Sequence, residues 1–384
     1  MPLSDIRAAV AGVGFIGVAH VEALRRLGVD VVGVVGSSPD RARIKAAAAN
    51  LPRVYESYDE LVGDPQVDVV HVATPNYAHA DQVRRAFESN KHVVCEKPLA
   101  MTSDETNDLL ERAEASGLVH AVCYNIRFYP LCHEMRALVG SGAIGEPRFV
   151  TGSYLQDWLL QPTDWNWRLV RQEAGELRAV ADIGTHWLDL ARFITGRDVV
   201  EVMAELHTFV PVRRHPRGPV ETFAAPSDDH DLIEEEMSSD DAAGIMLRFD
   251  DGTRGVVAVS QVSAGRKNSV TIEVDGSESA LSWFSEDPDR LWIGHRGRPN
   301  EILQRDPSLV HEDAKRTIAY PAGHVEGYPD TFRSLFAEVY ADVELGGPSQ
   351  QPTYPTFADG HDALCVLDAI TLSAAEQSWA AVKR

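Results

Sequence analysis

The sequence is poor in positive charge. Lys and Arg total 36 against 58 Asp and Glu, which gives a formal net charge of −22 at pH 7. A surface this acidic repels nucleic-acid phosphates and anionic lipids, so we expect neither nucleic acid nor a membrane as a partner. No apolar run approaches the roughly 18 residues that a membrane-spanning helix needs. Asp5 and Arg7 also interrupt the apolar N-terminal stretch, which argues against a signal peptide.

Cysteine is scarce as well. Cys95, Cys123, Cys132 and Cys365 form no close pair and no CxxC motif. This spacing indicates neither a disulfide framework nor a zinc knuckle. A chain without such pairs suits a reducing compartment, and we expect a cytoplasmic protein.

What the chain does contain is alternating β-rich and helical periodicity over its first third, typical of an α/β fold. The length of 384 residues predicts two domains. Strands joined by helices imply right-handed crossovers and a doubly wound parallel sheet, which we assign to residues 1–125. The expected strands are Ile6–Ala11, Val29–Val35, Val67–Ala73, His92–Cys95 and Val119–Tyr124, and the expected helices are Ile16–Leu27, Arg41–Ala49, His79–Glu88 and Asp104–Ser116.

The pattern of expected secondary structure changes in residues 126–384, which we assign to a second domain. Short strand-like segments dominate its first part, and Asp251-Gly252 is a strong hairpin signal. These patterns predict a second, mostly antiparallel sheet, whereas Val212–Asp241 has no clear period and is expected to be an exposed excursion. The expected strands are Phe149–Tyr154, Ala243–Phe249, Gly255–Gln261, Ser269–Val274 and Ser279–Ser285, and helical spacing returns at Pro329–Val343 and Phe357–Ser378.

A glycine-rich loop follows the first expected strand. Gly12, Gly14 and Gly17 match G-x-G-x-x-G, with Phe15 and Ile16 opening the next helix. Alone the pattern can be a plain turn, but here it begins a βαβ unit, which is the context that confirms it. The glycines allow a tight turn and leave the helix N–H groups to bind a pyrophosphate. These five residues therefore predict a dinucleotide site.

The end of the second expected strand bears on the choice between NAD and NADP. An acidic residue here would bind the adenosine ribose of NAD, but Ser37 and Ser38 occupy the place and Asp40 lies in the next turn. The two hydroxyls can donate to a 2′-phosphate, and Arg41 or Arg43 can supply positive charge. A serine that merely caps the next helix is the simpler alternative. We favour NADP.

Two further motifs point to a family. Glu96-Lys97-Pro98 ends the fourth expected strand, and Asp182-Ile183-Gly184-Thr185-His186 begins an expected helix. With the glycine loop, they make the chain resemble the glucose–fructose oxidoreductase/inositol dehydrogenase (Gfo/Idh/MocA) family over nearly its full length. The resemblance implies an N-terminal Rossmann domain that binds NAD(P) and a C-terminal α/β domain with a large open sheet. It also implies a sugar or polyol substrate and assembly as a homodimer or homotetramer.

The resemblance places Lys97, Asp182 and His186 at the family's catalytic positions. Oxidation of a secondary alcohol needs one group to hold the oxygen and another to accept its proton. We assign His186 as the acid/base and Lys97 as the polarising partner, although the reverse stays open, and Asp182 as the group that orients both substrate and histidine. The Asp182–His186 spacing also permits a metal, but no third ligand is evident and we expect none. Asp189 is expected to pair with Arg192.

Other residues form the expected surroundings of the site. Arg168 either contacts the cofactor or orders the site, and Arg127 either faces the substrate or forms a structural salt bridge. Glu176 or Arg178, where relatives carry glycines, is expected to alter the pocket mouth. Tryptophans can stack on sugar faces, although most are core residues. The expected cofactor contacts also include Thr74, Asn76, His79, Glu96 and Lys97, and the expected substrate contacts are Lys97, Asn125, Trp158, Trp165, Asp182, His186 and His324.

The leading interpretation is an NAD(P)-dependent oxidoreductase that transfers hydride between nicotinamide and a secondary alcohol or ketone of a sugar, polyol or derivative. A related enzyme that cleaves glycosides with retained NAD, without net redox change, is one alternative. A non-enzymatic NAD(P)-binding sensor is another, although a sensor has no need of Lys97, Asp182 and His186 together.

Overall fold

The computed structural model describes residues 2–51, 53–217, 220 and 232–384, and the chain divides into two compact units. The first comprises Met1–Tyr124, Gln172–Gly175 and Pro329–Leu364; the second comprises Asn125–Arg171, Glu176–Tyr328 and Cys365–Arg384. Residues 329–364, which we assigned to the second domain, therefore lie in the first unit. The four cysteines are all free and buried.

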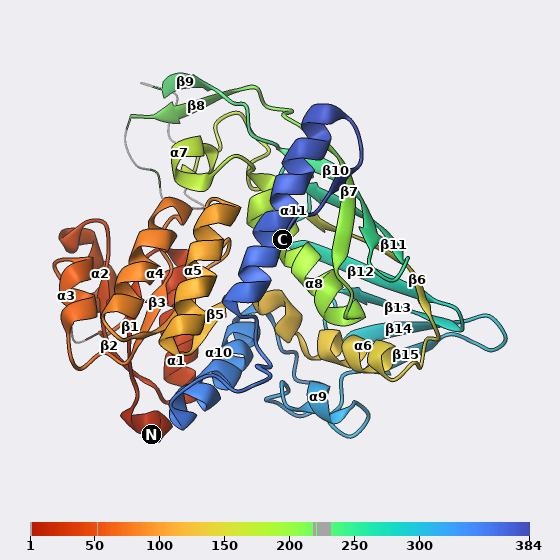
Figure 1. Cartoon of the computed structure of the whole chain (residues 1–384), viewed down its shortest axis with the longest axis horizontal. Coiled ribbons are helices and arrows are strands. Elements are labelled where there is room, and N and C mark those ends of the chain that lie inside the picture. Colours follow the sequence, from red (N-terminus) through yellow and green to blue (C-terminus); the bar gives the residue numbers. More distant parts are fainter. Residues whose placement is uncertain (1, 52, 218–219, 221–231) are drawn as a thin grey trace. The chain divides into compact units, whose positions relative to one another are not determined.

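The first unit contains a five-stranded parallel sheet in the order β2-β1-β3-β4-β5 (Figure 1). Because the order runs outward from β1 in both directions, right-handed crossovers place helices on both faces of the sheet. The predicted doubly wound fold is confirmed. Its strands are β1 (Arg7–Ala11), β2 (Asp30–Val35), β3 (Val69–Val72), β4 (His92–Cys95) and β5 (His120–Val122), and its helices include α1 (Phe15–Leu27), α2 (Pro39–Ala48), α3 (Tyr58–Gly63), α4 (His79–Glu88) and α5 (Ser103–Ser116).

Two short elements of this unit escaped prediction. Val54 forms a parallel bridge with Val34, which adds one residue pair beyond β2. Helix α3 follows, and the Ser57 side chain caps it by accepting a hydrogen bond from the Glu60 backbone N–H at 3.1 Å. The S-x-x-E spacing is a helix-start signature, but six residues are too few to show a helical period.

A C-terminal segment completes the first unit. Helix α10 (Tyr328–Leu345) buries Phe332, Phe336 and Tyr340 there. The Val122 N–H then donates to the Pro355 carbonyl at 2.9 Å, so the chain also pairs beside β5. Helix α11 (Phe357–Glu376) follows, and the division between the units falls inside it.

The second unit is built on a nine-stranded sheet in the order β15-β14-β13-β12-β6-β11-β10-β7-β16. All neighbours are antiparallel except β6 and β11, so the predicted mostly antiparallel sheet is confirmed. Helices α6 (Pro130–Gly140) and α8 (Thr185–Thr195) pack on it (Figure 1). Its strands are β6 (Pro147–Leu155), β7 (Val199–His207), β10 (Ala242–Phe249), β11 (Arg254–Ser260), β12 (Ser269–Gly276), β13 (Ser279–Phe284), β14 (Arg290–His295), β15 (Glu301–Gln304) and β16 (Ala380–Ala381).

The turn chemistry of this unit is partly as expected. Asp251-Gly252 joins the antiparallel strands β10 and β11, with Gly252 at a φ of +96°. Within the expected excursion 212–241, β8 (Val212–Pro216) pairs antiparallel with β9 (Leu232–Glu236), two strands that the sequence did not predict. Its middle, 218–219 and 221–231, lies outside the described residues.

The remaining α-helices of the described residues are α7 (Arg171–Ala174) and α9 (Glu312–Lys315). Among the helices that the structure describes, none has the length and apolarity to cross a bilayer.

Candidate active site

The carboxyl edge of the parallel sheet collects the predicted cofactor residues of the first unit. Open α/β sheets bind ligands at this edge because parallel strands all end there. The residues that follow β1, β2, β3 and β4 are, respectively, the loop Gly12–Gly17, the pair Ser37–Ser38, the run Thr74–Asn76 and the pair Glu96–Lys97.

The glycine loop has the backbone that its motif requires. Gly12 has a φ of +107°, and a Cβ added there would lie 2.2 Å from the Ala73 carbonyl oxygen. A Cβ on Gly17 would lie 2.0 Å from the Gly12 oxygen, whereas one on Gly14 would meet nothing within 4 Å. Gly14 also precedes the first N–H groups of α1, whose first turn carries no acidic residue. Open space beside the N-terminal end of a helix fits a dinucleotide pyrophosphate, and Phe15 and Ile16 lie in that first turn.

The two arginines expected to bind a 2′-phosphate, Arg41 and Arg43, differ in their surroundings after β2. Ser38 is the N-cap residue of α2, but its side chain makes no capping hydrogen bond. Arg43 donates to Asp40 at 2.8 Å and to Glu56 at 2.5 Å. Arg41 is exposed on the same helix. Of the two arginines proposed for this role, Arg43 is therefore engaged by carboxylates.

The expected cofactor residues after β3 form hydrogen bonds to other segments of the first unit. The Thr74 hydroxyl donates to Gln82 at 2.8 Å, and the Asn76 amide donates to the Ala174 carbonyl at 2.9 Å. His79 is fully buried, with Nδ1 2.9 Å from the Pro98 oxygen and Nε2 2.8 Å from the Thr74 oxygen. Burial lowers the pKa of His79. His79 thus ties the end of β3 to the segment after β4.

Lys97 follows β4 and is half-buried. Its peptide bond to Pro98 is cis, and its backbone N–H donates to Glu96 Oε2 at 3.2 Å. Burial alone would raise the pKa of Glu96, but the His20 hydrogen bond and charge and the Lys97 charge outweigh burial and lower it to about 2. A charged carboxylate therefore lies directly before the predicted catalytic lysine.

In the second unit, Asp182 lies in a π-helical turn, Val180–Gly184, that leads directly into α8. Such turns are frequent at functional sites. Asp182 Oδ1 accepts from Arg168 Nε at 2.9 Å, and Oδ2 accepts from Gln261 Nε2 at 2.7 Å. His186 is the second residue of α8 and is buried, with its ring 6.2 Å from that of Tyr154. Arg168 thus orders Asp182, one of the two roles expected of it.

Gln261 belongs to a network that sequence reasoning missed. Its Oε1 accepts from Arg178 Nη1 at 3.0 Å, which turns its amide N–H groups toward Asp182. Asp241 accepts hydrogen bonds from both Arg178 and Arg213, and all of these side chains are buried. The expectation that Arg178 alters a pocket mouth was wrong, because Asp241 provides a buried charge partner. Glu176 instead pairs with Arg171 on the surface.

The remaining predicted site residues of the second unit have mixed surroundings. Trp158 donates to Gln156 at 2.7 Å, and Trp165 stacks on His215 with ring centroids 3.6 Å apart. Asn125 is buried, whereas His324 is exposed.

Two expectations about ion pairs are resolved here. Arg127 forms a bidentate salt bridge with Asp189: its Nε donates to Oδ2 at 2.9 Å, and its Nη2 donates to Oδ1. This is the structural role, one of the two considered for Arg127. Arg192, the expected partner of Asp189, donates to Asp198 instead at 2.8 Å.

Comparisons with known proteins match both the N-terminal and the C-terminal part of the chain. A model described as "Oxidoreductase family, NAD-binding Rossmann fold" matches residues 6–124, and the GFO/IDH/MocA C-terminal domain matches residues 132–282. Levoglucosan dehydrogenase of Pseudarthrobacter phenanthrenivorans is 29% identical over 98% of both chains. Myo-inositol 2-dehydrogenase of Thermotoga maritima is 27% identical over 89% of this chain and 90% of its own.

Solved structures give the same result. A levoglucosan dehydrogenase in complex with NADH and L-sorbose has a TM-score of 0.87 at 28% identity and covers 99% of both chains. An inositol dehydrogenase homologue from Azotobacter vinelandii, complexed with NAD+, has a TM-score of 0.84 at 27% identity over 98% of this chain and 97% of that one. With both of its domains matched, the chain belongs to the Gfo/Idh/MocA family of oxidoreductases with an NAD-binding Rossmann fold.

Proposed function

We propose that this enzyme oxidises a secondary hydroxyl of a sugar, polyol or related compound, or reduces the corresponding ketone. The observation that carries the proposal is the pair of motifs in their structural settings. Lys97 follows strand β4 at the nucleotide-binding edge, and Asp182 lies with both carboxylate oxygens engaged one turn before His186. The similarity to levoglucosan dehydrogenase and to myo-inositol 2-dehydrogenase supports a polyhydroxylated substrate.

The three residues divide the chemistry. Bound nicotinamide supplies the hydride acceptor for oxidation. His186 takes the hydroxyl proton, since an imidazole titrates near neutral pH. Lys97 polarises the substrate oxygen through its ammonium group. Asp182 already accepts hydrogen bonds from Arg168 and Gln261, so it orients the substrate and His186 as a fixed negative charge.

We further propose that NADP is preferred over NAD. The hydroxyls of Ser37 and Ser38 and the exposed guanidinium of Arg41 support this preference, because all three can donate to a 2′-phosphate. No carboxylate follows β2 directly to repel that phosphate. The first helical turn of α2 nevertheless contains Asp40, which Arg43 neutralises in part.

The deciding experiment is nicotinamide reduction by the purified protein over a panel of sugars, polyols and glycosides, each with NAD and with NADP. We expect at least one polyhydroxylated compound to reduce the cofactor, and NADP to give the higher kcat/KM. Release of an aglycone without net cofactor reduction would overturn the proposal in favour of the redox-neutral glycoside-cleaving enzyme. Cofactor binding with no turnover of any alcohol or of the matching ketones would favour a sensor.

We also propose that the enzyme assembles as a homodimer or homotetramer in a reducing compartment. The sheet of the second unit exposes three large apolar side chains on neighbouring strands: Phe149 at 39%, Met246 at 41% and Val256 at 40%. Met246 and Val256 face each other across β10 and β11. Apolar patches of this kind mark association surfaces, and the four free cysteines suit a reducing environment.

A further inference from the structure

A line of buried polar side chains leads to Glu96, directly before Lys97. His20 lies on α1, His71 on β3 and Tyr340 on α10, and all three are buried, as is Glu96. His20 Nε2 lies 3.1 Å from Glu96 Oε1, and His20 Nδ1 lies 3.0 Å from His71 Nδ1. His71 Nε2 in turn lies 2.9 Å from the Tyr340 hydroxyl. These contacts form one continuous line within the first unit.

The charge of Glu96 fixes the direction of its hydrogen bond. With a pKa lowered to about 2, Glu96 is ionised and only accepts hydrogen bonds, so His20 Nε2 carries a proton and donates it. The rest of the line then has two arrangements. In one, Tyr340 donates to His71, which donates to a neutral His20. In the other, His20 holds one more proton and donates to His71, which donates to Tyr340.

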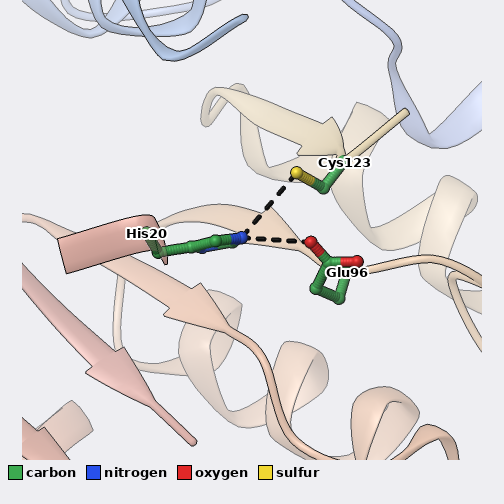
Figure 2. A group of neighbouring side chains, drawn as sticks. All are labelled: His20, Glu96 and Cys123. Atoms are coloured by element: carbon green, nitrogen blue, oxygen red, sulfur yellow. Dashed lines mark hydrogen bonds and ion pairs between the residues drawn. The ribbon is translucent and has the colours of Figure 1, made fainter. Parts of the chain in front are cut away.

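Cys123 lies beside the same nitrogen. Its Sγ is 3.7 Å from His20 Nε2, and Figure 2 shows the His20 ring edge facing both Cys123 and Glu96. The three side chains could in principle hold a metal ion, since their ligand atoms lie within 4.8 Å of one another. However, burial and then the Glu96 charge raise the pKa of the Cys123 thiol well above its ordinary value. His20 Nε2 lies at hydrogen-bond distance from both Glu96 Oε1 and Cys123 Sγ, so hydrogen bonds account for the contacts of the cluster.

Aromatic rings from α10 hold the histidine in place. The ring centroids of Phe332 and Phe336 lie 5.5 and 4.9 Å from that of His20. The His20 ring is thereby fixed on its apolar sides, while its two nitrogens are fixed by Glu96 and His71. The second oxygen of Glu96 accepts from the Lys97 backbone N–H.

We propose that His20 is a positioning residue for Lys97. The line from Tyr340 through His71 to His20 keeps the Glu96 carboxylate charged and oriented, and Glu96 fixes the backbone at Lys97. This inference rests on the proposed function, in which Lys97 acts on the substrate. The titratable groups of the line and those that act on it are His20 of α1, Asp68 before β3, His71 of β3, His79 of α4, Cys95 of β4, Glu96 and Lys97 after β4, Cys123 after β5 and Tyr340 of α10.

The test compares His20→Gln with His20→Phe by the pH dependence of kcat. Glutamine keeps a donor for Glu96 without a charge, whereas phenylalanine keeps neither. When the His20 donor is lost, burial raises the pKa of Glu96, and a glutamine donor restores only part of the support that the imidazole gives. The acid limb of the profile should therefore move to higher pH in the order wild type, His20→Gln, His20→Phe. At neutral pH we expect kcat to fall about tenfold in His20→Phe, the loss of one charge-assisted hydrogen bond, with most of it recovered in His20→Gln and little change in cofactor KM.

His120→Gln is the matched control, because His120 is a half-buried histidine of β5 whose ring packs on Phe357 instead. Its acid limb should stay where the wild-type limb lies. An equal shift in His120→Gln, or no shift in either His20 variant, would overturn the proposal by assigning His20 a general packing role.

A second readout needs no turnover. In ¹⁵N-histidine NMR, the His20 signals are identified by their absence in His20→Gln, and Nε2 should be protonated at every pH at which the protein is folded. A deprotonated Nε2, or stoichiometric zinc in the purified protein, would overturn the proposal. A wild-type protein that turns over no alcohol contradicts the proposed function alone, because the NMR result still decides the state of His20.

Discussion

The residues of the proposed site come from two segments far apart in the sequence. Lys97 follows a parallel strand, and His186 begins a helix almost ninety residues later in the chain. Each is preceded by a carboxylate that is already engaged: Glu96 by His20, and Asp182 by Arg168 and Gln261. If Lys97 and His186 react as proposed, the carboxylates before them are ordered before any substrate arrives, which reduces the entropy lost in reaching the transition state.

Removal of either reactive group should abolish most turnover. We expect Lys97→Ala and His186→Ala each to lower kcat by about 10²–10⁴-fold, the range typical of acid–base groups. Steady-state kinetics with the best substrate of the panel measures the loss, and cofactor fluorescence titration serves as the control, since binding should persist. Near-normal kcat in both variants would contradict the site assignment.

The cofactor preference depends on single side chains after β2. Arg41→Ala should weaken NADP binding about tenfold, the value of one charge-assisted hydrogen bond, and leave NAD binding unchanged. Arg43→Ala is the matched control and should have a smaller effect, because Asp40 and Glu56 already engage Arg43. Ser37→Asp should shift preference toward NAD by repulsion. The ratio of the two Kd values measures all three, and an unchanged ratio in Arg41→Ala would place the phosphate elsewhere.

At the scale of elements, the π-helical turn 180–184 depends on strand β11 and the residue after it. Gln261 follows β11 and joins Asp182 of the turn to Arg178 just before it. Asp240 reinforces the same turn by accepting from the backbone N–H groups of Arg178 and Val180, at 2.6 and 2.9 Å. The geometry of Asp182 is therefore set by groups about sixty and eighty residues away in sequence.

Gln261→Met should test this dependence. The variant keeps the volume but leaves Asp182 and Arg178 each short of a partner, so we expect a stability loss of about 1–3 kcal/mol and a fall in kcat larger than the change in KM. Urea unfolding and steady-state kinetics measure the two effects. Gln304→Met, which removes only a hydrogen bond to the Asp289 carbonyl at 3.1 Å, is the control. Equal kinetics in the two variants would disprove the link to Asp182.

Helix α6 carries an acid-sensitive residue. Burial, followed by the charges of Arg127, Arg316 and Arg136, lowers the pKa of His133 to about 3. Since the folded pKa lies below the unfolded value of about 6.5, the unfolded chain binds the proton first, and stability falls as the pH drops from about 6.5 toward 3. At about pH 5, the free energy of unfolding of His133→Leu should therefore exceed that of wild type by ~2 kcal/mol. At about pH 8 the two proteins should differ little, and urea unfolding at both pH values measures the difference. No pH-dependent gain would contradict the assignment.

Much of the element order was predictable, and the reasons for the failures differ. Helix α4 and strand β4 were predicted to the residue, because strong periodicity ends at clear turn signals. Strands β7, β14 and β15 were missed, since they combine charged residues with short apolar runs. The two motifs proposed to be catalytic were visible because the residues of each are close in sequence. Gln261 and His20 were not, because their partners lie 79 and 76 residues away and no local pattern reports such contacts.

For the whole molecule, the exposed apolar patch of the nine-stranded sheet predicts self-association. We expect light scattering after size exclusion to show a dimer or tetramer for wild type. The double variant Met246→Lys/Val256→Lys should be a monomer, because two facing charges cannot be buried without cost. Ile302→Lys, an exposed apolar position on strand β15, is the control. A monomeric wild type, or an assembled double variant, would contradict the proposed surface.

The division of the chain also sets an order for its synthesis. A ribosome delivers the five parallel strands within the first 124 residues, but Phe332, Phe336 and Tyr340 emerge only about 200 residues later. Until then, His20 and His71 lack the rings that cover them. The core of the nucleotide-binding unit therefore stays partly uncovered during synthesis of the larger unit, and its packing is completed only afterwards. A fragment cut at residue 124 would remain in that unfinished state.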